Sequence, residues 1–332
     1  MKLSVSNESG NVRLAVGDLV GCAFLVGCLS VPTAGQETRD RPLIIAHRGA
    51  SGYLPEHTLP AYAMAHAMGA DFVEPDLVRT RDGAFICLHD IHLEGTTDVE
   101  TRFPDRKRAD GRWYAADFDL AEIRLLRAHE RLKGRFPPGR SSFQVPTFEE
   151  MIELVEGLNR TSGRSVGIYP ELKAGEWHRT EGLVMEESFL EIARSYDLGG
   201  EGPPVFVQSF EAGSLRRLRE LGSKMPQIML MGAPFPEDPS QGKAMLADIA
   251  SFAQGIGPSK TILRRQPEVV KWAHERNLEV HPYTLRADDL GEGVATFEEE
   301  LELYYSTYGV DGLFTDFPDR ARAWLPSRGK AE

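Results

Sequence analysis

The sequence contains little cysteine. Cys22, Cys28 and Cys87 are the three that are present, and the first two lie in an N-terminal apolar segment. Once that segment is removed, Cys87 stands alone and an intrachain disulfide is excluded. We expect Cys87, within the apolar run of residues 85–88, to be a small buried residue with no catalytic role.

Long apolar runs are scarce as well. Residues 19–31 (LVGCAFLVGCLSV) are apolar but too short to span a bilayer comfortably, and small residues follow at positions 33–35. We therefore expect a signal peptide over residues 1–34, cleaved near Ala34, and an exported protein. A lipoprotein signal is the alternative, because residues 25–28 (LVGC) resemble a lipobox and lipidation of Cys28 would tether the protein to a membrane. An uncleaved hydrophobic anchor is the third option.

The chain also lacks an excess of positive charge, since its formal net charge is −12. Bulk electrostatics therefore argue against nucleic acid, and against a membrane except through the lipid anchor. An anionic substrate would need a locally positive site, for which Arg48 and Lys173 are candidates. With 332 residues, 41% of them hydrophobic, the chain can form one large domain or two ordinary ones. Nothing in the sequence indicates an oligomeric state.

What the sequence does contain is a dense group of polar residues within residues 43–90. An apolar strand-like run at residues 43–46 ends in His47 and Arg48, and a second run at residues 85–88 ends in His89. Between them, a helix is expected over residues 58–68 and a strand over residues 70–78.

Glu74 and Asp76 lie two residues apart on this predicted strand, so their side chains should point to the same face. Pro75 between them cannot donate to a sheet, and we expect a bulge or an unpaired amide there. Two aligned carboxylates, two histidines at strand ends and an arginine are the groups that metal-assisted phosphate chemistry needs. Each group alone would be an ordinary surface feature, but together they indicate a site.

This stretch resembles the glycerophosphodiester phosphodiesterase family. The segments that carry the resemblance are HRG at residues 47–49, PEHT at 55–58, EPD at 74–76 and HD at 89–90. The variant with His57, and the later HPYTLR and GLFTDFPD at residues 281–286 and 312–319, look like the periplasmic bacterial branch. The resemblance covers residues 42–325 and implies one catalytic domain there, in a secreted or periplasmic enzyme.

Strand-like runs and helical stretches alternate along most of the chain, which predicts an α/β fold. From pattern alone, a TIM-type (β/α)8 barrel and a doubly wound open sheet both remain, and the resemblance implies the barrel. Residues 91–145 break the alternation, because they are polar and rich in arginine, aspartate, glycine and proline. By the resemblance, they look like the family's small insertion after the second strand, which covers the mouth of the barrel.

The resemblance also implies roles for individual residues. Glu171 becomes the third metal carboxylate, beside Glu74 and Asp76. Three hard oxygen ligands suit Ca²⁺ or Mg²⁺ better than Zn²⁺, and export to a calcium-accessible compartment favours Ca²⁺. The other assigned residues are His47 and His89 as acid and base, Arg48, Lys173, Gln208, Phe210 and Tyr283 at the substrate, and Glu56 supporting His47 or Arg48.

The expected reaction is metal-dependent hydrolysis of a glycerophosphodiester, such as glycerophosphocholine or glycerophosphoethanolamine, to glycerol 3-phosphate and an alcohol. The two histidines would act as acid and base. Two alternatives remain open from the sequence. One is a related phospholipase that acts on lysolipids, and the other is a surface binding protein that keeps the barrel without turnover.

Overall fold

The computed structural model describes residues 41–139, 141–200, 202–232 and 234–325. The signal peptide predicted over residues 1–34, with Cys28 in it, lies outside the described residues. Within the described ranges, no helix has the length and apolar character that crossing a membrane would require.

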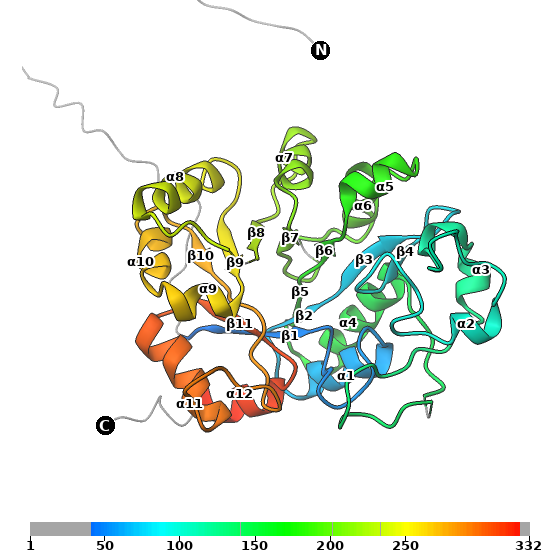
Figure 1. Cartoon of the computed structure of the whole chain (residues 1–332), viewed down its shortest axis with the longest axis horizontal. Coiled ribbons are helices and arrows are strands. Elements are labelled where there is room, and N and C mark those ends of the chain that lie inside the picture. The colour runs from blue at the N-terminus through cyan, green and yellow to red at the C-terminus, as the bar shows by residue number, and fades with distance from the viewer. Residues whose placement is uncertain (1–40, 140, 201, 233, 326–332) are drawn as a thin grey trace, which may run out of the picture. The chain divides into compact units, whose positions relative to one another are not determined.

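Parallel strands form the wall of a barrel, with helices around it (Figure 1). Backbone hydrogen bonds close the ring, since Asp311 N–H donates to the Val280 carbonyl at 3.1 Å and Phe314 N–H to the Pro282 carbonyl at 3.0 Å. In chain order, the wall consists of β1 (Leu43–His47), β2 (Phe72–Glu74) continued by β3 (Asp76–Arg79), β5 (Gly167–Ile168) continued by β6 (Glu171–Leu172), β7 (Val207–Ser209), β8 (Gln227–Met231), β9 (Gly255–Pro258), β10 (Glu279–Val280) and β11 (Gly312–Thr315).

The helices follow the strands and cover the outside of this wall. The longest of them shows how the sequence sets the boundaries: Thr147 and Glu150 form a capping box at its start, and Gly163 ends it with φ 70°. The barrel helices are α1 (Leu59–Ala67), α4 (Phe148–Ser162), α5 (Gly175–Thr180), α6 (Glu186–Ser195), α7 (Ala212–Glu220), α8 (Pro239–Ile249), α9 (Lys260–Arg265), α10 (Glu268–His274), α11 (Phe297–Glu302) with the π-helical turn Leu303–Tyr308, and α12 (Pro318–Trp324). The predicted TIM-type (β/α)8 barrel is therefore confirmed, and the doubly wound sheet is wrong.

Pro75 divides one barrel strand, as its missing amide donor predicts. β2 ends at Glu74 and β3 begins at Asp76, and the two parts pair with different neighbours: β2 with β1 and β5, and β3 with β6. The Pro75 carbonyl still accepts a hydrogen bond from Glu171 N–H at 2.9 Å. The division leaves both carboxylates on the inner side of the wall, where Glu74 and Asp76 are buried.

The insertion begins as an extension of the barrel wall. β4 (Phe85–Cys87) runs antiparallel to β3, and α2 (Val99–Arg102), the 3-10 turn η1 (Ala115–Asp117) and α3 (Leu120–Ile123) follow before α4. Although this segment is polar in sequence, it encloses its own apolar cluster, which includes Val99, Trp113 and Phe118. The insertion is thus a folded lobe attached to β3.

Candidate active site

The carboxyl ends of neighbouring strands carry the polar residues of the site. Strand register places His47 of β1 opposite Glu74 of β2, and Asp76 of β3 opposite Glu171 of β6. Glu171 in turn lies opposite Gln208 of β7. In a barrel of this type, catalytic side chains come from the ends of several strands at one face. The register explains how residues far apart in the sequence reach one layer.

Three buried carboxylates meet in this layer. One oxygen from each of Glu74, Asp76 and Glu171 lies within 4.8 Å of the others. Lys173 Nζ lies 2.9 Å from Glu171 Oε1 and 3.7 Å from Asp76 Oδ1. Carboxylate oxygens at this spacing are the donor set that Ca²⁺ and Mg²⁺ prefer, so the group fits a divalent metal site.

The electrostatics of the three carboxylates support the same conclusion. Burial, together with the charge of Asp76, raises the pKa of Glu74 well above its usual range. Burial raises the pKa of Glu171 to about 8, although Lys173 opposes the shift. Burial acts on Asp76 in the same direction, but Lys173 and Arg48 outweigh it and hold the pKa of Asp76 well below its usual range. The cluster therefore carries more carboxylate than its neighbours neutralise, and a divalent cation would compensate for this.

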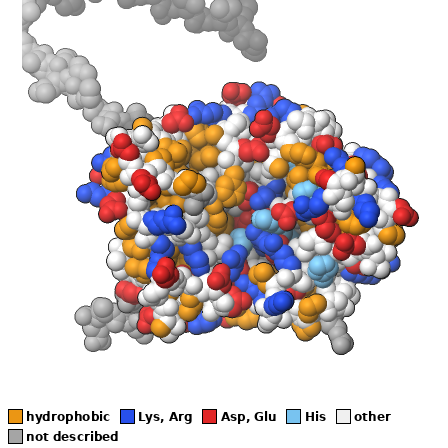
Figure 2. All heavy atoms as spheres, in the orientation of Figure 1, with side chains coloured by type: hydrophobic (Ala, Val, Ile, Leu, Met, Phe, Trp, Pro, Cys, Tyr) orange, Lys and Arg blue, Asp and Glu red, His pale blue; other side chains and the backbone are white. Residues whose placement is uncertain are grey.

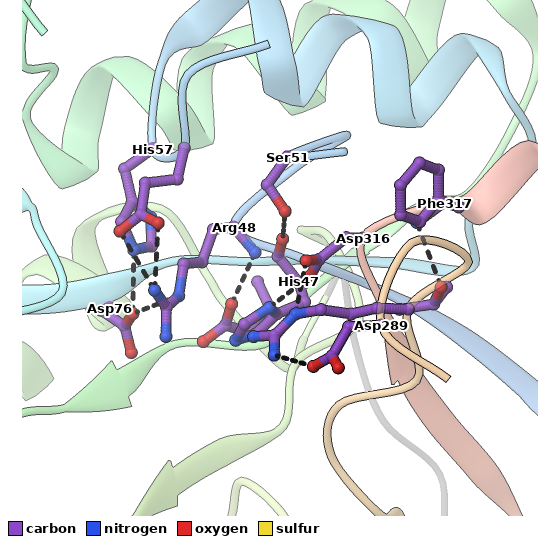
Figure 3. Close-up of polar contacts among 12 residues, drawn as sticks. His47, Arg48, Ser51, His57, Asp76, Asp289, Asp316 and Phe317 are labelled. Carbon is purple, nitrogen blue, oxygen red and sulfur yellow. Dashed lines mark hydrogen bonds and ion pairs between the residues drawn. The ribbon is translucent and has the colours of Figure 1, made fainter. Parts of the chain in front are cut away.

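His47 is fixed by an acidic partner from the last barrel strand. His47 Nδ1 and Asp316 Oδ1 lie 2.7 Å apart in a buried hydrogen bond, and the two side chains point toward one another (Figure 3). Burial lowers the pKa of His47 to about 4, despite the opposing charge of Asp316. His47 is therefore neutral near pH 7, and its Nε2 is the nitrogen left for exchanging a proton with a substrate.

Asp316 is itself held by two arginines. Arg135 Nη2 and Arg286 Nε each donate to Asp316 Oδ2 at 2.7 Å. Burial would raise the pKa of Asp316, but His47 and these arginines hold it far below its usual range. Asp316 lies in the GLFTDFPD segment at residues 312–319, to which the sequence analysis assigned no catalytic role. Its bond to His47 joins residues 269 positions apart, and no local pattern announces it.

His89 has a more open environment. His89 Nδ1 lies 2.9 Å from Asp90 Oδ1, with 27% of the histidine side chain and 46% of the aspartate side chain exposed. It lies two residues beyond the end of β4 and lines the cavity at the barrel mouth. The predicted pair His47 and His89 thus lines one cavity, with His47 at the end of β1 and His89 after β4.

Arg48 and Glu56 lie beneath the carboxylates. Arg48 adopts φ 59°, its backbone N–H donates to Glu74 at 2.8 Å, and its Nη1 donates to both oxygens of Glu56 at 3.1 Å. Its Nε lies 3.2 Å from Asp76 Oδ2 (Figure 3). Of the two partners predicted for Glu56, the structure shows Arg48. The guanidinium is largely engaged with acidic groups, yet Arg48 still lines the cavity.

His57 occupies a place that the sequence analysis missed, because it was treated as a loop residue. It lies in a turn with φ 57°, is 3% exposed, and its Nε2 is 2.8 Å from Asp76 Oδ2. Tyr62 OH holds its other ring nitrogen at 2.8 Å. His57 therefore orients a carboxylate of the cluster from behind, as histidines and carboxylates commonly do around metal sites. The PEHT segment at residues 55–58 contains His57, but residue spacing alone did not show that its partner is Asp76.

A cavity of about 280 Å³ opens over these groups. Histidine and basic side chains gather near the centre of this face (Figure 2). Phe210 is 43% exposed and packs edge to face against Tyr283. Lys173 Nζ lies 5.7 Å from the centre of the Phe210 ring. All site residues predicted from the sequence line this cavity except Asp76 and Glu56, which are buried next to it. The lining residues are His47, Arg48, Glu74, His89, Glu171, Lys173, Gln208, Phe210, Leu230, Ser259, Lys260, Thr261, Tyr283, Thr284, Arg286 and Phe314.

Comparison with known proteins shows which family the chain belongs to. Residues 47–320 match the model of the glycerophosphoryl diester phosphodiesterase family. This chain belongs to that family. A glycerophosphodiester phosphodiesterase of Haemophilus influenzae is 34% identical over 94% of this chain and 96% of its own length. The enzyme of Treponema pallidum is 30% identical over 90% of this chain and 93% of its own.

Solved structures agree with the barrel. A putative glycerophosphoryl diester phosphodiesterase from Silicibacter pomeroyi superposes with a TM-score of 0.69 at 25% identity, covering 87% of this chain and 94% of its own. An Oleispira antarctica phosphodiesterase, solved with the product sn-glycerol-3-phosphate, gives a TM-score of 0.65 at 22% identity over 86% and 97% of the two chains. At 22% identity, the likeness to the Oleispira antarctica structure supports the fold alone. Together with the family match, these relatives identify the chain as an enzyme that hydrolyses glycerophosphodiesters.

Proposed function

We propose that this enzyme hydrolyses small glycerophosphodiesters, such as glycerophosphocholine and glycerophosphoethanolamine, to glycerol 3-phosphate and an alcohol. We also propose that it needs a divalent metal and uses His47 and His89 as acid and base. One observation carries the proposal: a single cavity is lined by both histidines and Lys173 and borders carboxylate oxygens that lie within 4.8 Å of one another.

Glu74, Asp76 and Glu171 would hold the metal. A metal bound there would polarise a phosphoryl oxygen and lower the pKa of a neighbouring hydroxyl. We favour Ca²⁺ over Mg²⁺, because the export proposed below would bring the enzyme to a calcium-accessible compartment and Ca²⁺ accepts a wider range of oxygen-ligand geometries than Mg²⁺ does. Lys173 is close enough to the cluster to orient two of its members and to face the substrate phosphate.

The histidines would divide the proton transfers. The substrate carries a free hydroxyl next to its phosphodiester, so attack by that hydroxyl benefits from proximity. One histidine would accept the hydroxyl proton, and the other would donate a proton to the departing alcohol. A cyclic phosphate forms in this step, and water opens it with the two roles reversed.

The remaining lining residues would bind the substrate. Arg48 and Lys173 supply positive charge for the non-bridging oxygens. Gln208 donates to Glu74 at 3.2 Å, which places its amide beside the phosphate position. Phe210 and Tyr283 form an aromatic edge for the organic part of the substrate.

The size of the cavity favours small soluble substrates over lysolipids. About 280 Å³ lies at the lower end of the volumes that ligand pockets commonly have, and an acyl chain would need a further apolar channel. A binding protein without turnover is disfavoured by the family match and by the presence of every predicted catalytic residue.

We further propose that the enzyme is exported to the periplasm or beyond, with cleavage near Ala34 or lipidation at Cys28. The motive is the apolar segment of residues 19–31. Mass spectrometry of the exported protein distinguishes the two forms. An intact N-terminus on a cytoplasmic protein would contradict both.

The central test uses the purified protein with glycerophosphocholine, before and after chelation. We expect release of glycerol 3-phosphate and choline, loss of the activity with chelator, and recovery with added Ca²⁺. A parallel assay on lysophosphatidylcholine should show little turnover. Hydrolysis that survives complete chelation would overturn the metal dependence, and a preference for the lysolipid would overturn the substrate assignment.

A further inference from the structure

Arg135 belongs to the polar insertion, yet its side chain is almost fully buried against the barrel. Only 5% of that side chain is exposed, although neighbouring residues of the same loop are open to solvent. A long charged side chain is seldom buried unless it is paired and hydrogen-bonded. The burial of Arg135 therefore implies specific polar partners for its guanidinium.

These contacts cross from the insertion to three segments at the barrel mouth. Arg135 Nη1 donates to the Ser51 carbonyl at 3.1 Å, just after β1. Its Nε and Nη2 donate to Asp288 at 2.8 and 3.0 Å, and Nη2 also donates to Asp316 at 2.7 Å. The guanidinium lies 5.6 Å from the centre of the Phe317 ring. One side chain thus ties together the segments that follow β1, β10 and β11.

Asp316 receives this bond on the oxygen that does not face His47. Oδ2 accepts from Arg135 and Arg286, while Oδ1 remains for His47 Nδ1. Two donors on one oxygen fix the rotation of the carboxylate. A fixed Oδ1 determines which tautomer His47 adopts and how its ring is turned.

We propose that Arg135 is a positioning residue for the His47–Asp316 pair, so that the insertion supplies part of the acid–base apparatus. This inference rests on the proposed function, in which His47 exchanges a proton with the substrate. Arg135 does not line the cavity and acts through Asp316.

The test compares Arg135→Gln and Arg135→Lys with the matched control Arg127→Gln. Arg127 is an exposed arginine of the same insertion and bonds the Ser142 carbonyl at 2.9 Å. We expect Arg135→Gln to lower kcat by at least about tenfold with little change in KM, as loss of an orienting partner commonly does. Arg135→Lys should fall between, because an ammonium cannot span three acceptors as a guanidinium fork does. Arg127→Gln should match the parent enzyme.

A double-mutant cycle with His47→Ala separates positioning from general damage. If Arg135 acts through His47, then Arg135→Gln should cost little once His47 is absent. The melting temperature and the Ca²⁺ affinity of each variant are measured alongside. An equal loss of kcat in both backgrounds would overturn the inference, as would an Arg135→Gln variant that behaves like the control.

A direct readout follows the ring itself. In ¹⁵N-labelled histidine spectra of the parent, the His47 Nδ1 proton should give a hydrogen-bonded resonance that disappears in His47→Ala. Arg135→Gln should weaken or broaden that resonance, and an unchanged resonance would count against the inference. If His47→Ala itself keeps full activity, the proposed function fails instead, so the two failures are distinguishable.

Discussion

The two histidines at the mouth of the barrel stand in opposite surroundings. His47 has 10% of its side chain exposed and bonds an aspartate that is 2% exposed, whereas the corresponding values for His89 and Asp90 are 27% and 46%. The partner of His47 comes from the far end of the chain, and the partner of His89 is the next residue. In the proposed mechanism, one proton-transfer group is thus held in place before the substrate arrives, and the other can adjust to the substrate.

The contrast indicates a division of labour in catalysis. A preorganised group lowers the cost of reorganisation at the moment of reaction, and here that group is His47 on the barrel side. A more exposed group can adjust to substrates of different shape, and in the proposed mechanism that group is His89, next to the insertion. Both histidines border the same three carboxylates, so changes to these carboxylates should affect both.

The largest effect is expected from the shared metal site. Glu74→Gln should reduce activity to background, because it removes a ligand, and Glu74→Ala and Asp76→Ala should do the same. The metal-free melting temperature of Glu74→Gln should stay equal or rise, since the pKa of Glu74 is raised by burial beside Asp76 and a neutral amide relieves that repulsion. Activity assays and thermal melts in chelator measure both effects.

Glu268→Gln on the exposed face of α10 is the control for this variant, because it makes the same chemical change far from the cavity. A Glu74→Gln enzyme with normal activity at low Ca²⁺ would remove Glu74 from the metal site. A large fall in its metal-free stability would instead contradict the account of electrostatic crowding.

The histidines themselves come next. His47→Ala and His89→Ala should each lower kcat by about 10²- to 10⁴-fold with metal affinity little changed. The double variant should lose less than the product of the two, because groups that act as one unit are not additive. A substrate with an activated leaving group should restore whichever variant lacks the acid.

His92→Ala is the control, since His92 packs against Tyr114 in the insertion and does not line the cavity. Near-normal turnover of both cavity variants on glycerophosphocholine would contradict the assignment. So would a larger loss of kcat in His57→Ala than in either of them, with its Ca²⁺ binding intact.

The two aspartates give the sharpest test of the contrast. Asp316→Asn should lower kcat by about 10- to 100-fold, because His47 loses the acceptor that fixes its ring. Asp90→Asn should cost about fivefold or less, since exposed charged pairs contribute little. Steady-state kinetics of the two variants measure the ratio, and equal losses would show that exposure is a poor guide to their roles.

The smallest effect concerns the second arginine of the insertion loop. Arg131 Nε donates to Glu56 at 2.9 Å, and Glu56 holds Arg48 beneath the carboxylates. The pair is partly exposed on the Arg131 side, so Arg131→Gln should change kcat/KM by about fivefold or less. A loss as large as that expected for Arg135→Gln would mean that the insertion supports Arg48 as strongly as it supports His47.

Much of the site could be predicted from sequence because its parts are local. Glu74 and Asp76 alternate on one strand, His47 and His89 end apolar runs, and Pro75 interrupts the strand where its missing donor requires it. What could not be predicted depends on chain segments that meet only after folding. Asp316 reaches His47, and Arg135 reaches Asp316, across 269 and 181 positions respectively.

The fold shows the same limit on a smaller scale. Gly182 adopts φ 78°, and the chain turns there between α5 and α6. At α8, Asp238 caps the helix and Pro239 occupies its first turn, so a local signal marks where this helix starts. Short helices of this kind are stabilised mainly by packing on the barrel, which sequence periodicity does not reveal.

The pairing of the first and last barrel strands has a consequence for the time at which the enzyme becomes active. β1 pairs with β11, and Asp316 follows β11 directly, so His47 meets its partner only when the last strand docks. A chain still being synthesised would already carry its three buried carboxylates and both histidines. Its barrel would remain open along β1, and His47 would lack the aspartate that orients it. Full activity is thereby coupled to the docking of β11 and Asp316 against β1.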